Sequence, residues 1–274
     1  MIINPIERWS GRILLTVFLI LTILPLVNMV SAALQPADVN PTGLAWPSDP
    51  QWGNFAKAFE AGHVWTLMAS SALIVLGVVP VSLLISSLAG FALGALKVKG
   101  HRAVLLVFVL GLTIPFEALI IPLYFQMKTI GALNTQWAII LPLIGLFMPF
   151  SVFWMRAHFV NVPAELTEAA RLDGANLWQE IRHVQLPLAF PALSALAVLL
   201  FLWTWNQFLL PVVLVAEPMR RTVAGALTFF QGQYSSSVAL LNAGALIIVA
   251  PTILVFIIFQ RQFIKALIQG AVKG

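Results

Sequence analysis

The sequence predicts an all-α membrane protein whose helices cross the bilayer six times. Hydrophobic residues make up 60% of its 274 residues and charged residues only 9%, and its mean hydropathy is +0.96. A soluble domain of this length has too much surface to cover with so few charged side chains. The apolar residues also form long blocks, each of which can cross a bilayer core as a helix of about 20 residues.

Six blocks are long enough to cross, and we expect residues 1–274 to form one transmembrane domain. The blocks cover residues 13–34, 66–96, 103–123, 137–158, 188–213 and 239–262. Backbone polar groups in lipid must be satisfied within each segment, and no block alternates as a membrane β-strand does. A cleaved signal peptide is the alternative for the first block, which is longer than the apolar core of about 7–15 residues that a signal has.

Two local patterns modify the expected helices. Ser86, Gly90 and Gly94 fall four residues apart in the second block, so they form a stripe that permits close approach of a neighbouring helix. Prolines lie within three of the blocks: Pro115 and Pro122 in the third, Pro142 and Pro149 in the fourth and Pro251 in the sixth. Each proline removes a backbone hydrogen bond, so we expect a kinked or loosened helix there.

Lys and Arg residues give the expected orientation, since short cytoplasmic loops are rich in them. With the N-terminus inside, eleven of the fifteen basic residues are inside: Arg8, Arg12, Lys97, Lys99, Arg102, Arg156, Arg171, Arg182, Arg261, Lys265 and Lys273. Lys57, Lys128, Arg220 and Arg221 are outside. We therefore expect a multi-pass protein of the cytoplasmic (inner) membrane with both termini in the cytoplasm.

A polar segment, residues 162–191, separates the fourth and fifth blocks. Its six Asp, Glu and Arg side chains are Glu165, Glu168, Arg171, Asp173, Glu180 and Arg182. We expect the connection between the two blocks, which we call the loop, at about residues 159–187. The orientation rule places this loop in the cytoplasm. It is a water-facing element of a membrane protein.

The loop sequence predicts two short helices with a break between them. Pro163 suits a first helical position, and Gly174 tolerates the left-handed conformation that ends a helix. Asn176 with Gln179 three residues later fits a capping box for the second helix. We expect Pro187 to end that helix before the next apolar block begins.

Several kinds of chemistry have no sequence support. The chain has no cysteine and no Gly-x-x-x-x-Gly-Lys-Ser/Thr motif, and its four histidines do not fall in His-x-x-x-His spacing. We therefore expect no catalytic residue, metal or cofactor in this chain. The net charge of +5 is a property of the loops rather than of a nucleic-acid-binding surface, so lipid and not nucleic acid is the expected environment.

Glu117 is the one acid well inside an apolar block. An unpaired carboxylate is expensive to bury in a membrane, so such a residue usually faces a bundle interior or a wet cavity. A place on a solute pathway, a structural hydrogen bond to a neighbouring helix, and a position near the outer interface are the open alternatives.

A second candidate for a solute pathway lies in the fifth block. We expect Trp203, Asn206 or Gln207, and Leu210 to share one helical face. An indole can cover the apolar face of a polyol while a carboxamide donates to and accepts from its hydroxyl groups. The alternative is that the indole packs the bundle and the amide bonds another helix.

The loop resembles a known family motif. The run Glu-Ala-Ala-Arg-Leu-Asp-Gly at residues 168–174, followed after nine residues by Val-Gln-Leu-Pro at 184–187, is similar to the EAA loop of the inner-membrane permease subunits of binding-protein-dependent ABC importers. The family usually has Ile where Val184 stands. Weaker traces of the carbohydrate-uptake branch, like the second permease of maltose-type and glycerol-3-phosphate-type systems, lie at residues 89–93, 114–116, 121–124, 205–208, 260–263 and 270–274.

The resemblance implies a function. By this resemblance the first loop helix would be a coupling helix on a separate ATPase. The coupling residues of the loop would be Glu168, Ala169, Ala170, Arg171, Asp173, Gly174, Leu186 and Pro187. The expected partners are a second homologous permease, an ATP-binding cassette ATPase dimer that binds ATP and Mg, and an extracytoplasmic solute-binding protein. The expected solute is a sugar, an oligosaccharide or a glycerol-phosphate-like polyol. A permease for a non-sugar solute and an ion-coupled secondary transporter are the alternatives.

Overall fold

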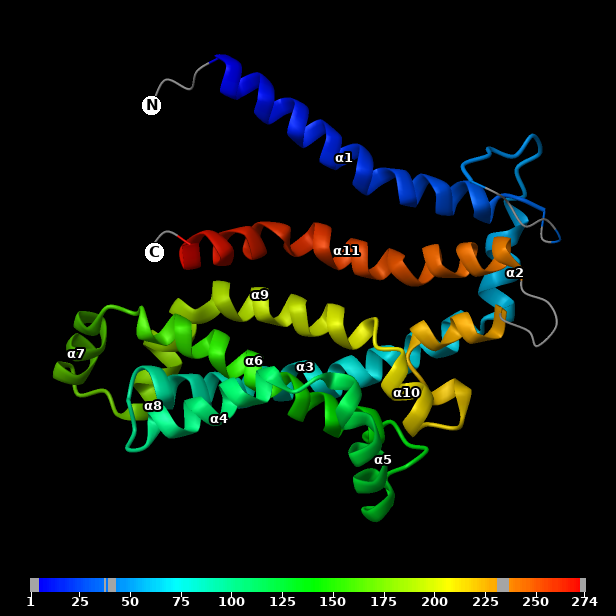
Figure 1. Cartoon of the computed structure of the whole chain (residues 1–274). Helices are drawn as coiled ribbons and strands as arrows, with labels where there is room; N and C mark the ends of the chain where they lie inside the picture. The colour runs from blue at the N-terminus through cyan, green and yellow to red at the C-terminus, as the bar shows by residue number, and fades with distance from the viewer. Residues whose placement is uncertain (1–4, 37, 39–42, 231–236, 272–274) are drawn as a thin grey trace. The chain divides into compact units, whose positions relative to one another are not determined.

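The computed structural model describes residues 5–36, 38, 43–230 and 237–271, and every regular element within them is a helix (Figure 1). Five of these helices are long and apolar enough to cross a membrane, and a bent helix pair, His101–Thr113 with Phe116–Thr129, meets the same criterion when its two parts are taken together. The all-α membrane class is therefore confirmed. Contacts divide the chain into two compact units, Met1–Trp65 with Ala226–Ala250 and Thr66–Gly225 with Pro251–Gly274. The single domain stays a prediction.

The first unit holds α1 (Pro5–Ala33), α2 (Gly53–Ala61) and the first half of α11 (Val238–Ala271). Asn54 ties α2 to the end of α1, because its Nδ2 donates to the carbonyl oxygens of Ala33 at 2.9 Å and Gln35 at 2.7 Å. The helix α2 lies in a stretch for which the sequence pattern predicts no element.

The second unit holds most of the spans. Its elements are α3 (Val64–Gly94), α4 (His101–Thr113), η1 (Phe116–Leu119), α5 (Ile120–Thr129), α6 (Trp137–Val160), α7 (Ala164–Leu172), α8 (Leu177–Glu180), η2 (Ile181–Gln185), α9 (Leu186–Trp205), α10 (Leu209–Leu214), η3 (Pro218–Arg220) and the second half of α11. The short helix η4 (Val223–Phe230) begins at the end of this unit. The central helix α6 packs against both α4 and α9. Figure 1 shows α7 and α8 at one end of this unit and α5 and α10 at the other.

The small-residue stripe on α3 packs closely against α6, as predicted. A Cβ atom added at Gly90 would lie 2.7 Å from the Cβ of Met155 and 2.8 Å from the backbone nitrogen of Arg156. One added at Gly94 would lie 3.0 Å from the Arg156 carbonyl oxygen. The two backbones therefore touch where α3 approaches the loop end of α6, and this contact fixes α6 ahead of the loop.

We expect Gly90→Val to destabilise the protein by about 1–3 kcal/mol, because the added side chain meets atoms that include helix backbone. Gly145→Val is the matched control. It makes the same substitution within a helix, here α6, and a Cβ added at Gly145 has no neighbour within 4 Å. Thermal unfolding in detergent measures the difference. Equal unfolding midpoints for the two variants would contradict the close contact.

The third apolar block bends far more than a proline kink. The helix α4 ends at Thr113, and the chain continues as η1 and α5 at an angle of 98° to it. Pro115 has no amide hydrogen and pushes the residue before it out of the helical region, and Ile114 has φ −78° and ψ 122°. The expected block at 103–123 is therefore two helices joined at a break.

The fifth span begins and ends earlier in the sequence than the predicted block of residues 188–213. It runs unbroken from Leu177 to Trp205, so the prediction that Pro187 ends the second loop helix is wrong. The π-turn η2 lies immediately before Leu186 and Pro187 and carries the helix past the proline. Proline cannot donate to the carbonyl four residues before it, and the wider turn accommodates this loss.

Candidate functional site: the loop between α6 and α9

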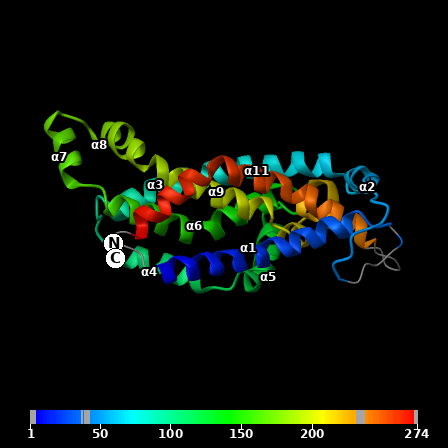
Figure 2. The same cartoon turned by 90° about the horizontal axis from the view of Figure 1, so that it is seen from above.

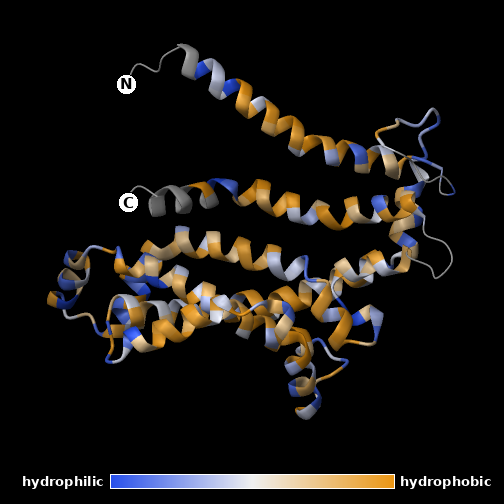
Figure 3. Ribbon diagram, in the orientation of Figure 1, coloured by the Kyte–Doolittle hydropathy of each residue, from blue (hydrophilic) through white to orange (hydrophobic). Residues whose placement is uncertain are grey.

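The loop begins with the helix α7, which lies beyond the ends of α6 and α9 within the second unit (Figure 2). Pro163 precedes the first helical residue, one position earlier than predicted. The helix ends at Leu172, and the predicted left-handed residue follows it at Gly174, whose φ is +82°. The amide of Ala175 donates to the Ala170 carbonyl at 3.0 Å, which helps to close the last turn. Figure 3 shows hydrophilic and hydrophobic residues side by side on α7, whereas the spans are mostly hydrophobic.

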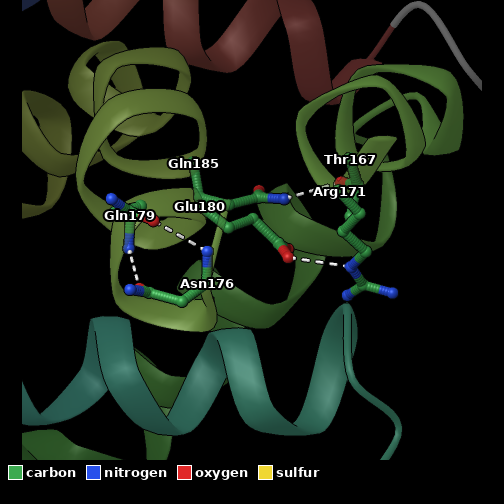
Figure 4. A network of polar contacts seen from close by, with 6 residues as sticks. All are labelled: Thr167, Arg171, Asn176, Gln179, Glu180 and Gln185. Atoms are coloured by element: carbon green, nitrogen blue, oxygen red, sulfur yellow. Dashed lines mark hydrogen bonds and ion pairs between the residues drawn. The ribbon is translucent and has the colours of Figure 1, made fainter. Parts of the chain in front are cut away.

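The second loop helix starts with the predicted capping box. The amide nitrogen of Gln179 donates to Oδ1 of Asn176 at 3.0 Å, and the Asn176 amide donates to Oε1 of Gln179 at 2.8 Å (Figure 4). Two backbone donors that a helix start leaves without partners are thereby satisfied. This fixes where α8 begins relative to the break at Gly174.

Two side-chain contacts join α7 to the α8–η2 segment. Nε of Arg171 donates to Oε2 of Glu180 at 3.0 Å, and Nε2 of Gln185 donates to Oγ1 of Thr167 at 3.0 Å (Figure 4). Glu180 is 2% exposed and Gln185 1%. Neither Glu180 nor Gln185 is among the predicted coupling residues. The available signals were their polar side chains close to an apolar block and, for Gln185, its place in the Val-Gln-Leu-Pro run.

The predicted coupling residues fall into two groups. Glu168, Ala169, Arg171 and Asp173 are exposed on α7 or at its end, with Gly174 beside them and Ala170 half-buried. Leu186 and Pro187 instead begin α9. Leu172, which the prediction omitted, is 88% exposed and is the most exposed large apolar side chain of the described residues.

An apolar cavity of about 430 Å³ lies beside the second group. Leu186 lines it together with Phe91 of α3, Phe159 of α6, Trp178 of α8 and Phe190 of α9. The start of α9 is therefore bordered by apolar space, which Gln185 also lines.

The predicted solute-pathway residues on the fifth block do not share a helical face. The helix α9 ends at Trp205, Asn206 is its C-terminal cap, and Leu210 lies on the separate helix α10. Trp203 packs against two α6 rings, Phe147 and Phe150, with ring centroids 5.5 and 5.0 Å away. The helical-face prediction is therefore wrong, because the chain leaves the helix between the indole and the amides.

Asn206 and Gln207, the two residues that follow the end of α9, make different hydrogen bonds. Nδ2 of Asn206 donates to the Leu202 carbonyl at 2.8 Å and reaches Oγ1 of Thr252 at 3.5 Å. Thr222 donates its hydroxyl to the backbone carbonyl of Gln207. Asn206 is exposed, and within the described residues its Oδ1 has no hydrogen-bond partner, so this oxygen can accept from a hydroxyl group.

Glu117 lies on η1, directly after the bend at Pro115, and is exposed. Among the described residues, the Glu117 carboxylate makes no hydrogen bond or ion pair. The alternative of a structural hydrogen bond to a neighbouring helix therefore has no support within the described residues. The described part of the chain also has no group of three His, Asp or Glu side chains that could hold a metal ion. The loop is therefore the best-defined polar site.

A bundle of apolar spans with an exposed helix between two of them defines a multi-span membrane protein. The sequence comparisons agree with this class. The chain belongs to the family described as the binding-protein-dependent transport system inner membrane component, which matches residues 82–269. The family resemblance seen in the loop is thereby confirmed, and the family is one of transporter components, not of enzymes.

Curated relatives cover almost the whole chain. The arabinooligosaccharides transport system permease protein AraQ of Halalkalibacterium halodurans is 35% identical to this chain. The alignment covers 99% of this chain and 98% of the length of AraQ. The trehalose transport system permease protein SugB of Mycobacterium tuberculosis is 31% identical, over 92% of this chain and 93% of its own.

Solved structures share the fold. A chain of a bacterial ABC transporter involved in import of the acidic polysaccharide alginate matches with a TM-score of 0.79 and 21% identity, over 96% of this chain and 99% of its own. A chain of the MetNI methionine ABC transporter in an inward-facing form matches with a TM-score of 0.55 and 20% identity, over 74% of this chain and 94% of its own. The six-span permease fold is therefore confirmed.

Proposed function

We propose that this chain is a permease subunit of an ATP-driven importer for a sugar or oligosaccharide. Family membership supports the permease role, and the names of relatives such as AraQ and SugB support the solute class. The observation that carries the mechanism is α7, a short exposed helix between two spans that is tied to the second of them. Because α7 is exposed and contacts the second of these spans, a partner that binds and moves α7 also moves that span.

In this proposal α7 docks on a separate ATPase. Ala169 is small and exposed and allows close approach, while Leu172 offers 88% of its surface for burial. Glu168 and Arg171 form charge-assisted bonds at the rim of the contact. ATP and Mg are bound by the ATPase dimer, so hydrolysis takes place in the partner. A second homologous permease completes the pathway, and a solute-binding protein delivers the solute.

The basic residues support a cytoplasmic position for α7. Within the second unit, Lys97 and Lys99 lie between α3 and α4, at the end that carries α7, whereas Lys128 is on α5 at the other end (Figure 1). The positive-inside rule therefore puts α7 in the cytoplasm of an inner-membrane protein. With six spans, both termini are cytoplasmic too.

For the solute pathway we propose the break after α9, where Asn206 has an unoccupied acceptor within the described residues. We expect Asn206→Ala to lower transport by about tenfold, as the loss of a hydrogen bond or two to a polyol predicts, and to leave assembly with the ATPase unchanged. Thr252→Val is the control, because it removes only the 3.5 Å neighbour of the amide. Loss of assembly in Asn206→Ala would favour a packing role instead.

Uptake by cells tests the proposed function. A strain lacking this chain should fail to take up one radiolabelled sugar or oligosaccharide of a panel, and the intact gene should restore uptake. A thermal-shift screen of the solute-binding protein encoded nearby should identify the same solute. Unchanged uptake of every panel member would contradict the proposal, as would uptake that a protonophore abolishes while cellular ATP is kept constant.

A further inference from the structure

Four side chains fasten α7 to the base of α9, and we call them the α7 clamp: Thr167, Arg171, Glu180 and Gln185. Thr167 and Arg171 are four residues apart on α7, so they lie on the same face in successive turns. Each contact is 3.0 Å long. Two attachment points along one helix fix its angle as well as its position, which one contact could not do.

The π-turn η2 explains why both contacts can form. Glu180 and Gln185 are five residues apart, and in an α-helix of 3.6 residues per turn they would point about 140° away from each other. The i→i+5 pattern of the π-turn Ile181–Gln185 brings residues with this spacing to one side. In Figure 4 both side chains point toward α7.

Burial makes the clamp costly to open. Glu180 is 2% exposed and Gln185 1%, so neither can replace a lost partner with bulk water. Oε1 of Glu180 and Oε1 of Gln185 are already buried without a hydrogen-bond partner among the described residues. Since a guanidinium can bind a carboxylate through two nitrogens, Oε1 of Glu180 is a second acceptor for Arg171.

We propose that Glu180 and Gln185 are positioning residues that carry a displacement of α7 into the fifth span. The helix from Leu177 to Trp205 is continuous, so a force applied to its base through the clamp moves its whole length. Both residues are buried and therefore act through α7 instead of touching the ATPase. The inference rests on the proposed function, in which the ATPase moves α7.

Coupling in the reconstituted transporter gives the first test. We expect Glu180→Ala to reduce the solute transported per ATP hydrolysed by about tenfold or more, as loss of a bond to a charged group predicts, while the ATPase stays bound. Glu180→Gln is the matched control, because its amide oxygen still accepts from Nε of Arg171, and it should restore most of the coupling. A wild-type transport-to-hydrolysis ratio in Glu180→Ala would overturn the inference.

The second contact is tested by a double-mutant cycle. Thr167→Val and Gln185→Leu should each lower the same ratio, and the double variant should be no worse than the more damaging single variant, because both changes remove one bond. Strictly additive losses would contradict a direct link between these two side chains. Thr167→Val nearly preserves volume, so this arm remains informative if Glu180→Ala does not accumulate in the membrane.

A distance measurement tests the α7 clamp independently of the proposal that α7 docks on the ATPase. The chain has no cysteine, so nitroxide labels at Glu165→Cys on α7 and Leu188→Cys on α9, both exposed positions, need no background substitution. In the full-length chain in nanodiscs we expect a narrow distance distribution that broadens in Glu180→Ala. Equal widths would overturn the clamp. Broadening together with absence of any α7–ATPase contact would leave the clamp standing and reject the proposed docking.

Discussion

Gly174→Val is expected to leave the protein in the membrane but to lower transport by about tenfold or more. Gly174 has φ +82°, and a Cβ there would meet nothing within 4 Å, so space does not limit the substitution. The backbone does, because a left-handed conformation costs an L-residue roughly 1–2 kcal/mol and a β-branched residue more. The turn between α7 and α8 therefore opens and α7 loses its set position.

Gly174→Asn is the matched control for this prediction. Asparagine also adds a side chain, but it tolerates the left-handed conformation and occurs naturally at helix ends of this kind. We expect Gly174→Asn to keep most of the transport activity and Gly174→Val to lose it, measured as solute uptake at equal protein level in the membrane. Equal activity of the two variants would show that the φ of this residue is irrelevant to function.

Leu172→Asp should weaken binding of the ATPase by about 10- to 100-fold. The side chain is 88% exposed in this chain, so its removal has little effect on folding. Burying a leucine in an interface contributes about 1.5–3 kcal/mol, at about 1.4 kcal/mol per tenfold change in affinity. Co-purification of the complex and titration of the ATPase onto nanodisc-embedded permease measure the loss.

Leu172→Met controls for Leu172→Asp, because it keeps an apolar side chain of similar volume. It should retain near-normal affinity, and both variants should unfold at the same temperature as the wild type. Undiminished ATPase binding by Leu172→Asp would contradict the role of the exposed end of α7 in docking.

Local chemistry explains what the sequence predicts correctly. The turn at Gly174 and the capping box of Asn176 and Gln179 depend on neighbouring residues alone, and the structure contains both. The stripe around Gly90 was also predictable, because small residues at helical spacing have few other uses in an apolar helix. In each case the interacting groups lie within one or two helical turns, or follow from a simple periodicity.

Features that depend on backbone geometry over a longer range were not predictable. Pro115 signals a break but not an angle of 98°. Glu180 and Gln185 face α7 only because a π-turn replaces an α-helical one, and no residue type encodes that choice. The amides after Trp205 could not be placed either, since the sequence alone does not reveal that α9 ends there.

The central claim, that α7 is the contact for the ATPase, is tested most directly by photo-crosslinking. A benzophenone attached at Leu172→Cys in the otherwise cysteine-free chain should crosslink to the ATPase in the assembled transporter. The same group at the exposed Lys128→Cys on α5, at the other end of the second unit (Figure 1), should not. Crosslinking of the ATPase from residue 128 and not from residue 172 would contradict the account.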